Sequence, residues 1–168
     1  MSAQHTAQKT NAMRILDAAH IPYAVQAYDD NTNHELENGA ALRLAQKLGA
    51  DPAAVFKTIV MKTDSAEICV FCVPADSEVS IKKARAAAGA KSLEPVKPAQ
   101  LAALTGYIRG GCSPVGMKRC YRTFIDESAI LHERIYVSAG VRGMQLCLAP
   151  DDLATAVHAH VCPIASKP

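Results

Sequence analysis

Hydrophobic and polar positions divide the first two thirds of the chain into segments of helical and of strand-like period. Residues 10–19 place apolar side chains on one helical face behind a Thr10 or Asn11 cap, and residues 21–28 alternate as a strand does. Two apolar runs, residues 57–63 and 67–73, flank a short polar stretch and predict a hairpin. Three further helices are predicted from their boundary residues: one that ends at Gly49, one between Ser80 and Gly89, and one from Pro98 to about Gly106, with a helical start also at Asp51 and Pro52.

The last third of the chain is rich in strand-like segments. The runs 123–126, 134–139 and 144–149 have the pattern of strands, residues 150–159 have a helical pattern, and residues 160–164 form a short extension. Strands and helices are interspersed without strict alternation, which favours an α+β or mixed-sheet fold over a Rossmann-type fold. Neither a repeat nor a linker divides the chain, so its 168 residues predict one domain with a hydrophobic core.

Composition narrows the class of protein. The chain is 49% hydrophobic and 20% charged, and no apolar run reaches the roughly 18 residues of a membrane span. The N-terminal residues lack the apolar region of a secretory signal, so we expect a soluble cytoplasmic protein. In that compartment the six cysteines are expected to be reduced and mostly buried. The net charge of +2 does not by itself indicate a nucleic-acid-binding protein, although a local basic patch could bind phosphate.

The stretch RGGCSPVGMKR, residues 109–119, is the first candidate for chemistry. A nucleophilic Cys112 would need a lowered pKa and a nearby base, but the histidines are scattered along the chain and none is marked as its partner. The alternative is a small side chain that fills a tight loop. The backbone N–H groups of Gly110 and Gly111 could instead donate to a carbonyl or ribose oxygen, because no Cβ blocks a ligand there. A plain structural turn explains the same glycines equally well.

Two cysteine patterns raise the question of a metal site. Cys69 and Cys72 lie in a strand-like run that has no second ligand pair at zinc spacing, so buried core thiols are expected. His158, His160 and Cys162 have a period of two, but they follow a helical pattern that makes a common face doubtful. We therefore expect no metal.

Basic residues offer two further hypotheses. Lys57 stands between Phe56 and an apolar strand, where its ammonium either extends to solvent or is held at a pocket. Two clusters of basic residues are either solvated surface or a phosphate-binding rim around the glycine loop. The few aromatic residues argue against a broad base-stacking surface. The clusters comprise Lys82, Lys83, Arg85, Lys91 and Lys97, and then Lys118, Arg119 and Arg122.

Four segments, in this order and spacing, resemble one family. They are VFKTIVM (residues 55–61), GYIRGGCSPVGMKR (106–119), IYVSAGVRG (135–143) and LAPDDL (148–153). The chain resembles the YbaK/EbsC-type aminoacyl-tRNA deacylases, which are related to the editing insertion domain of prolyl-tRNA synthetase. The likeness runs from about Met13 to Pro163 and leaves residues 1–9 as a flexible N-terminal extension. It implies an α+β fold with a mixed, barrel-like sheet flanked by helices.

The resemblance also implies a function. This sequence is most similar to the branch that removes cysteine from tRNA(Pro) in trans, so the expected partners are aminoacyl-tRNA and prolyl-tRNA synthetase, with no membrane or DNA. No cofactor and no enzyme nucleophile are implied: either the substrate thiol or a water molecule attacks the aminoacyl ester. The alternatives are a deacylase for alanine or serine, a cysteine- or metal-dependent hydrolase of an unrelated small substrate, and a non-catalytic module that binds tRNA or a synthetase.

Roles for individual residues come from the same resemblance. Lys57 matches the family's essential pocket lysine and Tyr28 a pocket tyrosine. The loop that holds the aminoacyl-ribose end is matched by Gly110 and Gly111, with Ser113 and Pro114. Relatives often carry an aspartate where this chain has Gln145, and a glutamine can hydrogen-bond the substrate amine but cannot form an ion pair with it. The loop tolerates apolar residues at the position of Cys112, which favours a role for the backbone over the thiol.

Overall fold

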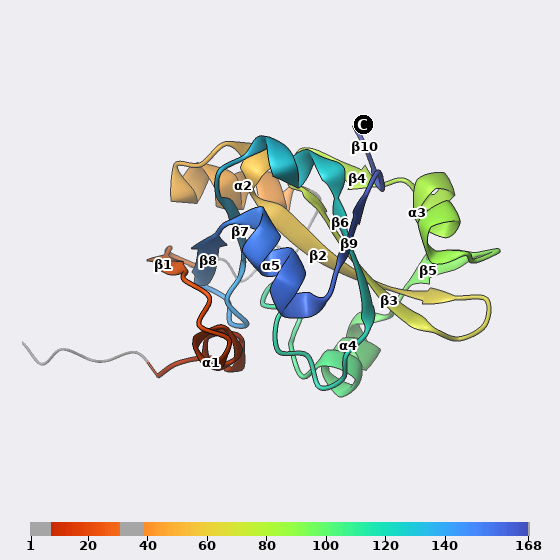
Figure 1. The fold of residues 1–168 in the computed structure, drawn as a ribbon, viewed down its shortest axis with the longest axis horizontal. Helices are drawn as coiled ribbons and strands as arrows, with labels where there is room; N and C mark the ends of the chain where they lie inside the picture. Colours follow the sequence, from red (N-terminus) through yellow and green to blue (C-terminus); the bar gives the residue numbers. More distant parts are fainter. Residues whose placement is uncertain (1–7, 31–38, 168) are drawn as a thin grey trace, which may run out of the picture.

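The computed structural model describes residues 8–30 and 39–167. Most of the predicted N-terminal extension, and residues 31–38, therefore lie outside the described residues. The largest sheet has five strands in the order β5-β2-β3-β6-β9 (Figure 1). The predicted hairpin is confirmed as β2 (Phe56–Thr63) and β3 (Ile68–Pro74), which pair antiparallel. The other strands are β5 (Leu93–Pro95), β6 (Arg122–Asp126) and β9 (His160–Cys162), of which β6 and β9 run parallel to their neighbours.

Two smaller sheets complete the strand structure. One has the order β1-β8-β7 and consists of β1 (Ala24–Ala27), β8 (Met144–Leu148) and β7 (Ile135–Ser138), all antiparallel. The other pairs β4 (Glu78–Val79) with β10 (Ala165–Ser166). The predicted α+β class with mixed sheets is confirmed. The barrel-like closure is corrected, because the described strands form three sheets and no closed barrel.

The helices begin and end close to the positions that their boundary residues predict. They are α1 (Asn11–Ala18), α2 (Ala40–Leu48), α3 (Ile81–Ala88), α4 (Pro98–Thr105) and α5 (Pro150–Val157), with 3₁₀ turns η1 (Pro52–Ala54) and η2 (Glu127–Leu131). Thr10 caps α1 by accepting a hydrogen bond from the Met13 N–H, and Ser80 caps α3 in the same way from Lys83. Such side-chain acceptors satisfy donors that the first helical turn leaves unpaired.

The core is divided between the two faces of the large sheet. On one face, residues of α1, β7, β8 and α5 surround Phe56, Val60 and Ile125. On the other face, α3 covers Phe71 and Phe124, whose rings stack with centroids 5.1 Å apart. A third, smaller cluster joins α2 to η1 and fixes the helix beside the start of β2.

The cysteine and membrane expectations can be compared with this fold. All six cysteines are free, and Cys69 and Cys72 are fully buried, as predicted for core thiols. The expectation that most of the six are buried is wrong, because three others, Cys112, Cys147 and Cys162, are half-buried and Cys120 is exposed. Across residues 8–30 and 39–167, no three histidine, cysteine or acidic side chains gather as a metal site would require. Within the same residues, no helix has the length and apolar character needed to cross a membrane.

Candidate active site

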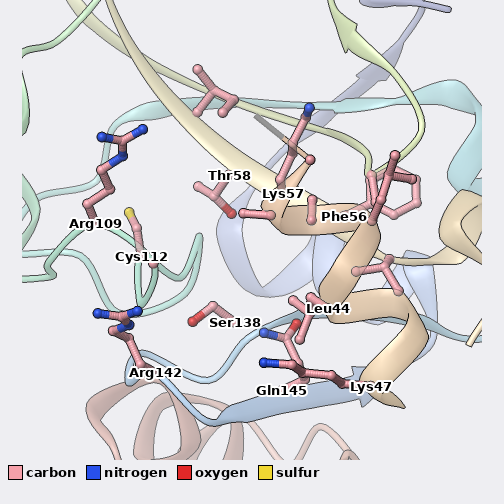
Figure 2. A pocket seen from close by; sticks show the side chains of 18 of the residues that line it. Leu44, Lys47, Phe56, Lys57, Thr58, Arg109, Cys112, Ser138, Arg142 and Gln145 are labelled. Atoms are coloured by element: carbon pink, nitrogen blue, oxygen red, sulfur yellow. The ribbon is translucent and has the colours of Figure 1, made fainter. Parts of the chain in front are cut away.

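A pocket of about 470 Å³ opens between α2, the start of β2, the glycine loop and the β7–β8 hairpin (Figure 2). Figure 2 shows Leu44 and Lys47 of α2 on one side of this space and Arg109, Cys112 and Arg142 on the other. The segments that line it are far apart in the sequence. Of the residues that the resemblance singled out, Tyr28, Lys57, Gly110 and Gln145 line the pocket, whereas Gly111, Ser113 and Pro114 are not among the lining residues.

Lys57 lies at the start of β2, where the consecutive residues 55–59 all line the pocket. Its neighbour Phe56 is 2% exposed and packs into the core, so Lys57 faces the other way. The lysine side chain is 22% exposed, and its ammonium donates to a carboxylate oxygen of Glu78 at 3.0 Å. Between the two hypotheses for this residue, the structure favours a lysine held at a pocket.

The glycine loop presents one of its two candidate N–H donors. Gly110 adopts a φ of 88°, which favours glycine, and its N–H has no acceptor among the described residues. The Gly111 N–H donates to the carbonyl of Ile108 at 3.0 Å and is therefore already engaged. A Cβ on Gly111 would lie 3.1 Å from the backbone nitrogen of Arg142, so this glycine allows the loop to pack against residues 141–142.

Ser113 and Pro114 lie beneath the loop. Ser113 is fully buried, and its hydroxyl accepts a hydrogen bond from the Val115 N–H at 3.2 Å. Pro114 is also buried. In this arrangement the two residues shape the loop from below and do not reach the pocket.

Cys112 lines the pocket, but its surroundings oppose ionisation. Burial raises the pKa of the Cys112 thiol to about 11, and a hydrogen bond with Thr105 offsets this only in part. A catalytic cysteine requires the opposite shift, towards a thiolate at neutral pH. The neutral thiol supports the hypothesis that Cys112 is not a nucleophile.

Within the described part of the chain, Gln145 presents a buried acceptor without a partner at the pocket. It lies on β8 opposite Gln26 of β1 and Ser138 of β7, and it is only 3% exposed. Its Oε1 is buried and has no hydrogen-bond partner among the described residues. A buried acceptor without a donor is costly, of order 1–3 kcal/mol. Since Gln145 also lines the pocket, a donor on a bound ligand would satisfy it.

Besides Lys57, three cationic side chains line the pocket, and the sequence analysis gave none of them a role there. Lys47, Arg109 and Arg142 line it together with Lys57, and Arg142 pairs with Asp30 at 2.9 Å. The two basic clusters, for which both solvated surface and a phosphate-binding rim were considered, do not contribute to the pocket lining. Arg122 of the second cluster instead pairs with Glu67, and Lys83 of the first bonds the Ala165 carbonyl.

The fold and this pocket define a class of protein, an α+β domain with a lysine and a glycine loop at one cleft. Residues 39–156 match the family model described as the aminoacyl-tRNA editing domain. The chain is also 36% identical to a protein of Enterococcus faecalis, "Putative Cys-tRNA(Pro)/Cys-tRNA(Cys) deacylase EbsC", over 167 residues that cover 99% of each chain. This protein therefore belongs to the aminoacyl-tRNA editing domain family.

Solved structures share the same fold. One, described as "a putative trans-editing enzyme for prolyl tRNA synthetase", is 21% identical with a TM-score of 0.78, covering 95% of this chain and 99% of that one. Another, a hypothetical protein, is 18% identical with a TM-score of 0.83, covering 94% and 100%. At these identities the likeness establishes the fold alone.

Proposed function

We propose that this protein is a deacylase that acts in trans and removes cysteine from mischarged tRNA(Pro). The observation that carries the proposal is the pocket itself, which combines the Lys57 ammonium with the unpartnered Oε1 of the buried Gln145. An aminoacyl ester offers a matching pair of features, an amino group that donates and a carbonyl that becomes negative during the reaction. The name of the 36%-identical relative supports the same substrate.

The proposal gives a role to each residue that the family resemblance singled out. The substrate amine donates to the Oε1 of Gln145, which is a neutral hydrogen bond and not an ion pair. Lys57 neutralises the charge that develops on the carbonyl oxygen, or holds the phosphate of the terminal adenosine. The Gly110 N–H donates to the carbonyl or to a ribose hydroxyl, and Tyr28 lines the wall beside them. Gly111, Ser113 and Pro114 act by holding the loop in shape.

The reaction needs no nucleophile from the enzyme. In the thiol route, the substrate sulfur attacks its own carbonyl carbon, the ester C–O bond breaks, and the ribose oxygen takes the proton. The products are free tRNA and a cysteine thiolactone. In the alternative route, a water molecule held by a ribose hydroxyl attacks instead and releases cysteine. Both routes rely on positioning and charge stabilisation, and neither requires a metal or cofactor.

The cellular setting follows from the substrate. We place the enzyme in the cytoplasm, where aminoacyl-tRNA is made and used, and we expect prolyl-tRNA synthetase as a partner that supplies the mischarged tRNA. The cations at the pocket are suited to the phosphates of an acceptor end, whereas the net charge of +2 indicates weak and salt-sensitive binding of the rest of the tRNA.

The proposal is tested by comparing three substrates. Wild-type protein is incubated with cysteinyl-, alanyl- and prolyl-tRNA(Pro), and the remaining ester is measured over time. Fast loss of cysteine alone supports the proposal, and a thiolactone among the products identifies the thiol route. Faster release of alanine than of cysteine would show that the enzyme acts on a different small amino acid. If no ester is cleaved while tRNA still binds, the protein is a binding module.

A further inference from the structure

Among residues 8–30 and 39–167, one carboxylate, that of Glu78, pairs with Lys57. Its Nζ lies 3.0 Å from an oxygen of Glu78, and both residues line the pocket. A lysine side chain has four rotatable carbon–carbon bonds and loses considerable rotamer freedom when it is fixed. Without a partner, the ammonium would sample many positions across a cavity of this size. The location of the charge in the pocket therefore depends on Glu78.

Glu78 is itself fixed through its backbone. It belongs to β4, a strand of two residues that would not be stable alone, and it pairs with Ser166 of β10. The segment that leads into β10 is clamped to the large sheet: Asp126, at the end of β6, accepts hydrogen bonds from the N–H groups of Ile164 at 3.0 Å and Ala165 at 2.9 Å. The Ile164 side chain is fully buried, so the clamp has a hydrophobic anchor.

We propose that Glu78 is a positioning residue, which holds the ammonium of Lys57 where the reaction needs it. This inference rests on the proposed function, because it assumes that Lys57 acts on the aminoacyl ester. Glu78 belongs to the two-stranded β4–β10 sheet and Lys57 to the five-stranded sheet, so the ion pair bridges the two and sets the position of the charge. The side chain of Glu78 is 69% exposed, so its removal leaves the core intact.

The first test compares the kinetics of two variants at this position. Glu78→Ala removes the acceptor, whereas Glu78→Gln keeps a neutral one. We expect kcat on cysteinyl-tRNA(Pro) to fall about tenfold in Glu78→Ala and only about threefold in Glu78→Gln, the scale of one hydrogen bond to a charged group. KM should stay nearly constant, since Lys47, Arg109 and Arg142 remain at the pocket. A carboxylate with a purely structural role would not produce this graded effect on kcat.

Glu67 provides a matched control. It also pairs with a cation, Arg122, at 3.0 Å, and its side chain is 43% exposed against 69% for Glu78, but it lies outside the pocket lining. Glu67→Ala should leave kcat unchanged. Equal kcat in wild type and Glu78→Ala would overturn the inference. So would a higher kcat in Glu78→Ala, because Glu78 would then compete with the substrate for Lys57.

A second measurement does not depend on activity. An ammonium held in a hydrogen bond exchanges its protons slowly enough to be seen in a cold ¹H–¹⁵N spectrum of the lysine side chains, and Lys57→Arg assigns the signal. We expect the Lys57 signal to be lost in Glu78→Ala and kept in Glu67→Ala. A signal that persists in Glu78→Ala contradicts the inference. If wild type cleaves no ester, the proposed function fails, and this spectrum still decides whether Glu78 holds Lys57.

Discussion

Cys112 occupies a position at which a thiol could be mistaken for a nucleophile. It lines the pocket and follows a pair of glycines, and two arginines lie on the same side of the cavity. Burial nevertheless dominates and raises the pKa of the thiol to about 11. Since alkylation and nucleophilic attack both require the thiolate, the buried thiol should be slow to react at physiological pH.

Alkylation with iodoacetamide tests this directly. At pH 8 only about a thousandth of a thiol with a pKa near 11 is ionised, so Cys112 should react at least about a hundredfold more slowly than the exposed Cys120. The rate at Cys112 should rise about tenfold for each pH unit up to pH 11, where ionisation approaches half. Peptide mass spectrometry resolves the two sites. Preferential alkylation of Cys112 at pH 8 would restore the nucleophile hypothesis.

The sequence allowed some site residues to be predicted but not others. Lys57 and Gly110 stand in motifs whose local pattern already suggests a use. The family resemblance singled out Gln145, but that its Oε1 is buried and unpartnered could not be predicted, because this depends on the arrangement of the neighbouring strands β1 and β7. Ser113 is a different case: the resemblance implies that it holds the substrate end, while in the structure its buried hydroxyl accepts a hydrogen bond from the Val115 N–H of its own loop.

At the scale of elements, the glycine loop is fixed by a residue that precedes it. Tyr107 is buried, and its hydroxyl donates to the carbonyl of Val115 at 2.6 Å. Burial raises the pKa of this phenol to about 12, so it remains a donor throughout the physiological range. The ring also packs against Gly140, which follows β7. Tyr107 therefore couples the glycine loop to the turn that follows β7.

Two glycine-to-alanine substitutions distinguish backbone strain from crowding. One replaces Gly140, beside the Tyr107 ring, and the other replaces Gly89, which has no close neighbour. Gly140 has a φ of 99°, and a Cβ there would lie 2.8 Å from the Tyr107 ring. Gly89 has a φ of 66° and open space around it. Gly89→Ala should lower the free energy of unfolding by about 1–2 kcal/mol through strain alone. Gly140→Ala should lower it by about 2–4 kcal/mol, because overpacking adds to the strain. Urea denaturation measures the free energy of unfolding of both variants. Equal decreases would show that the Tyr107 ring moves aside without an energetic cost.

The helices and the central hairpin were predictable because their signals are local. A capping residue, a closing glycine and an apolar period lie within one segment, as at Thr10 and Gly49. The strands β4, β5 and β10 were not predicted, since each has only two or three residues and exists through pairing with a distant segment. One of these, β4, carries Glu78.

At the scale of the whole molecule, the pocket is a product of tertiary arrangement. Its lining comes from α2, β2, the glycine loop, and β7 and β8, so its cations are scattered along the sequence. Counting basic residues in sequence clusters therefore did not locate these cations. The family resemblance predicted the fold correctly because several motifs in a fixed order and spacing together specify a tertiary arrangement. No single motif specifies it.

The central claim is that Lys57 and the loop backbone, and no enzyme thiol, remove the amino acid. The most direct test is the single-turnover rate of cysteine release from cysteinyl-tRNA(Pro) by wild type, Lys57→Ala and Cys112→Ala. We expect wild type and Cys112→Ala to react at similar rates and Lys57→Ala to be at least about a hundredfold slower, as is typical when a transition-state charge loses its partner. Undiminished release by Lys57→Ala, or loss of activity in Cys112→Ala, would contradict the account.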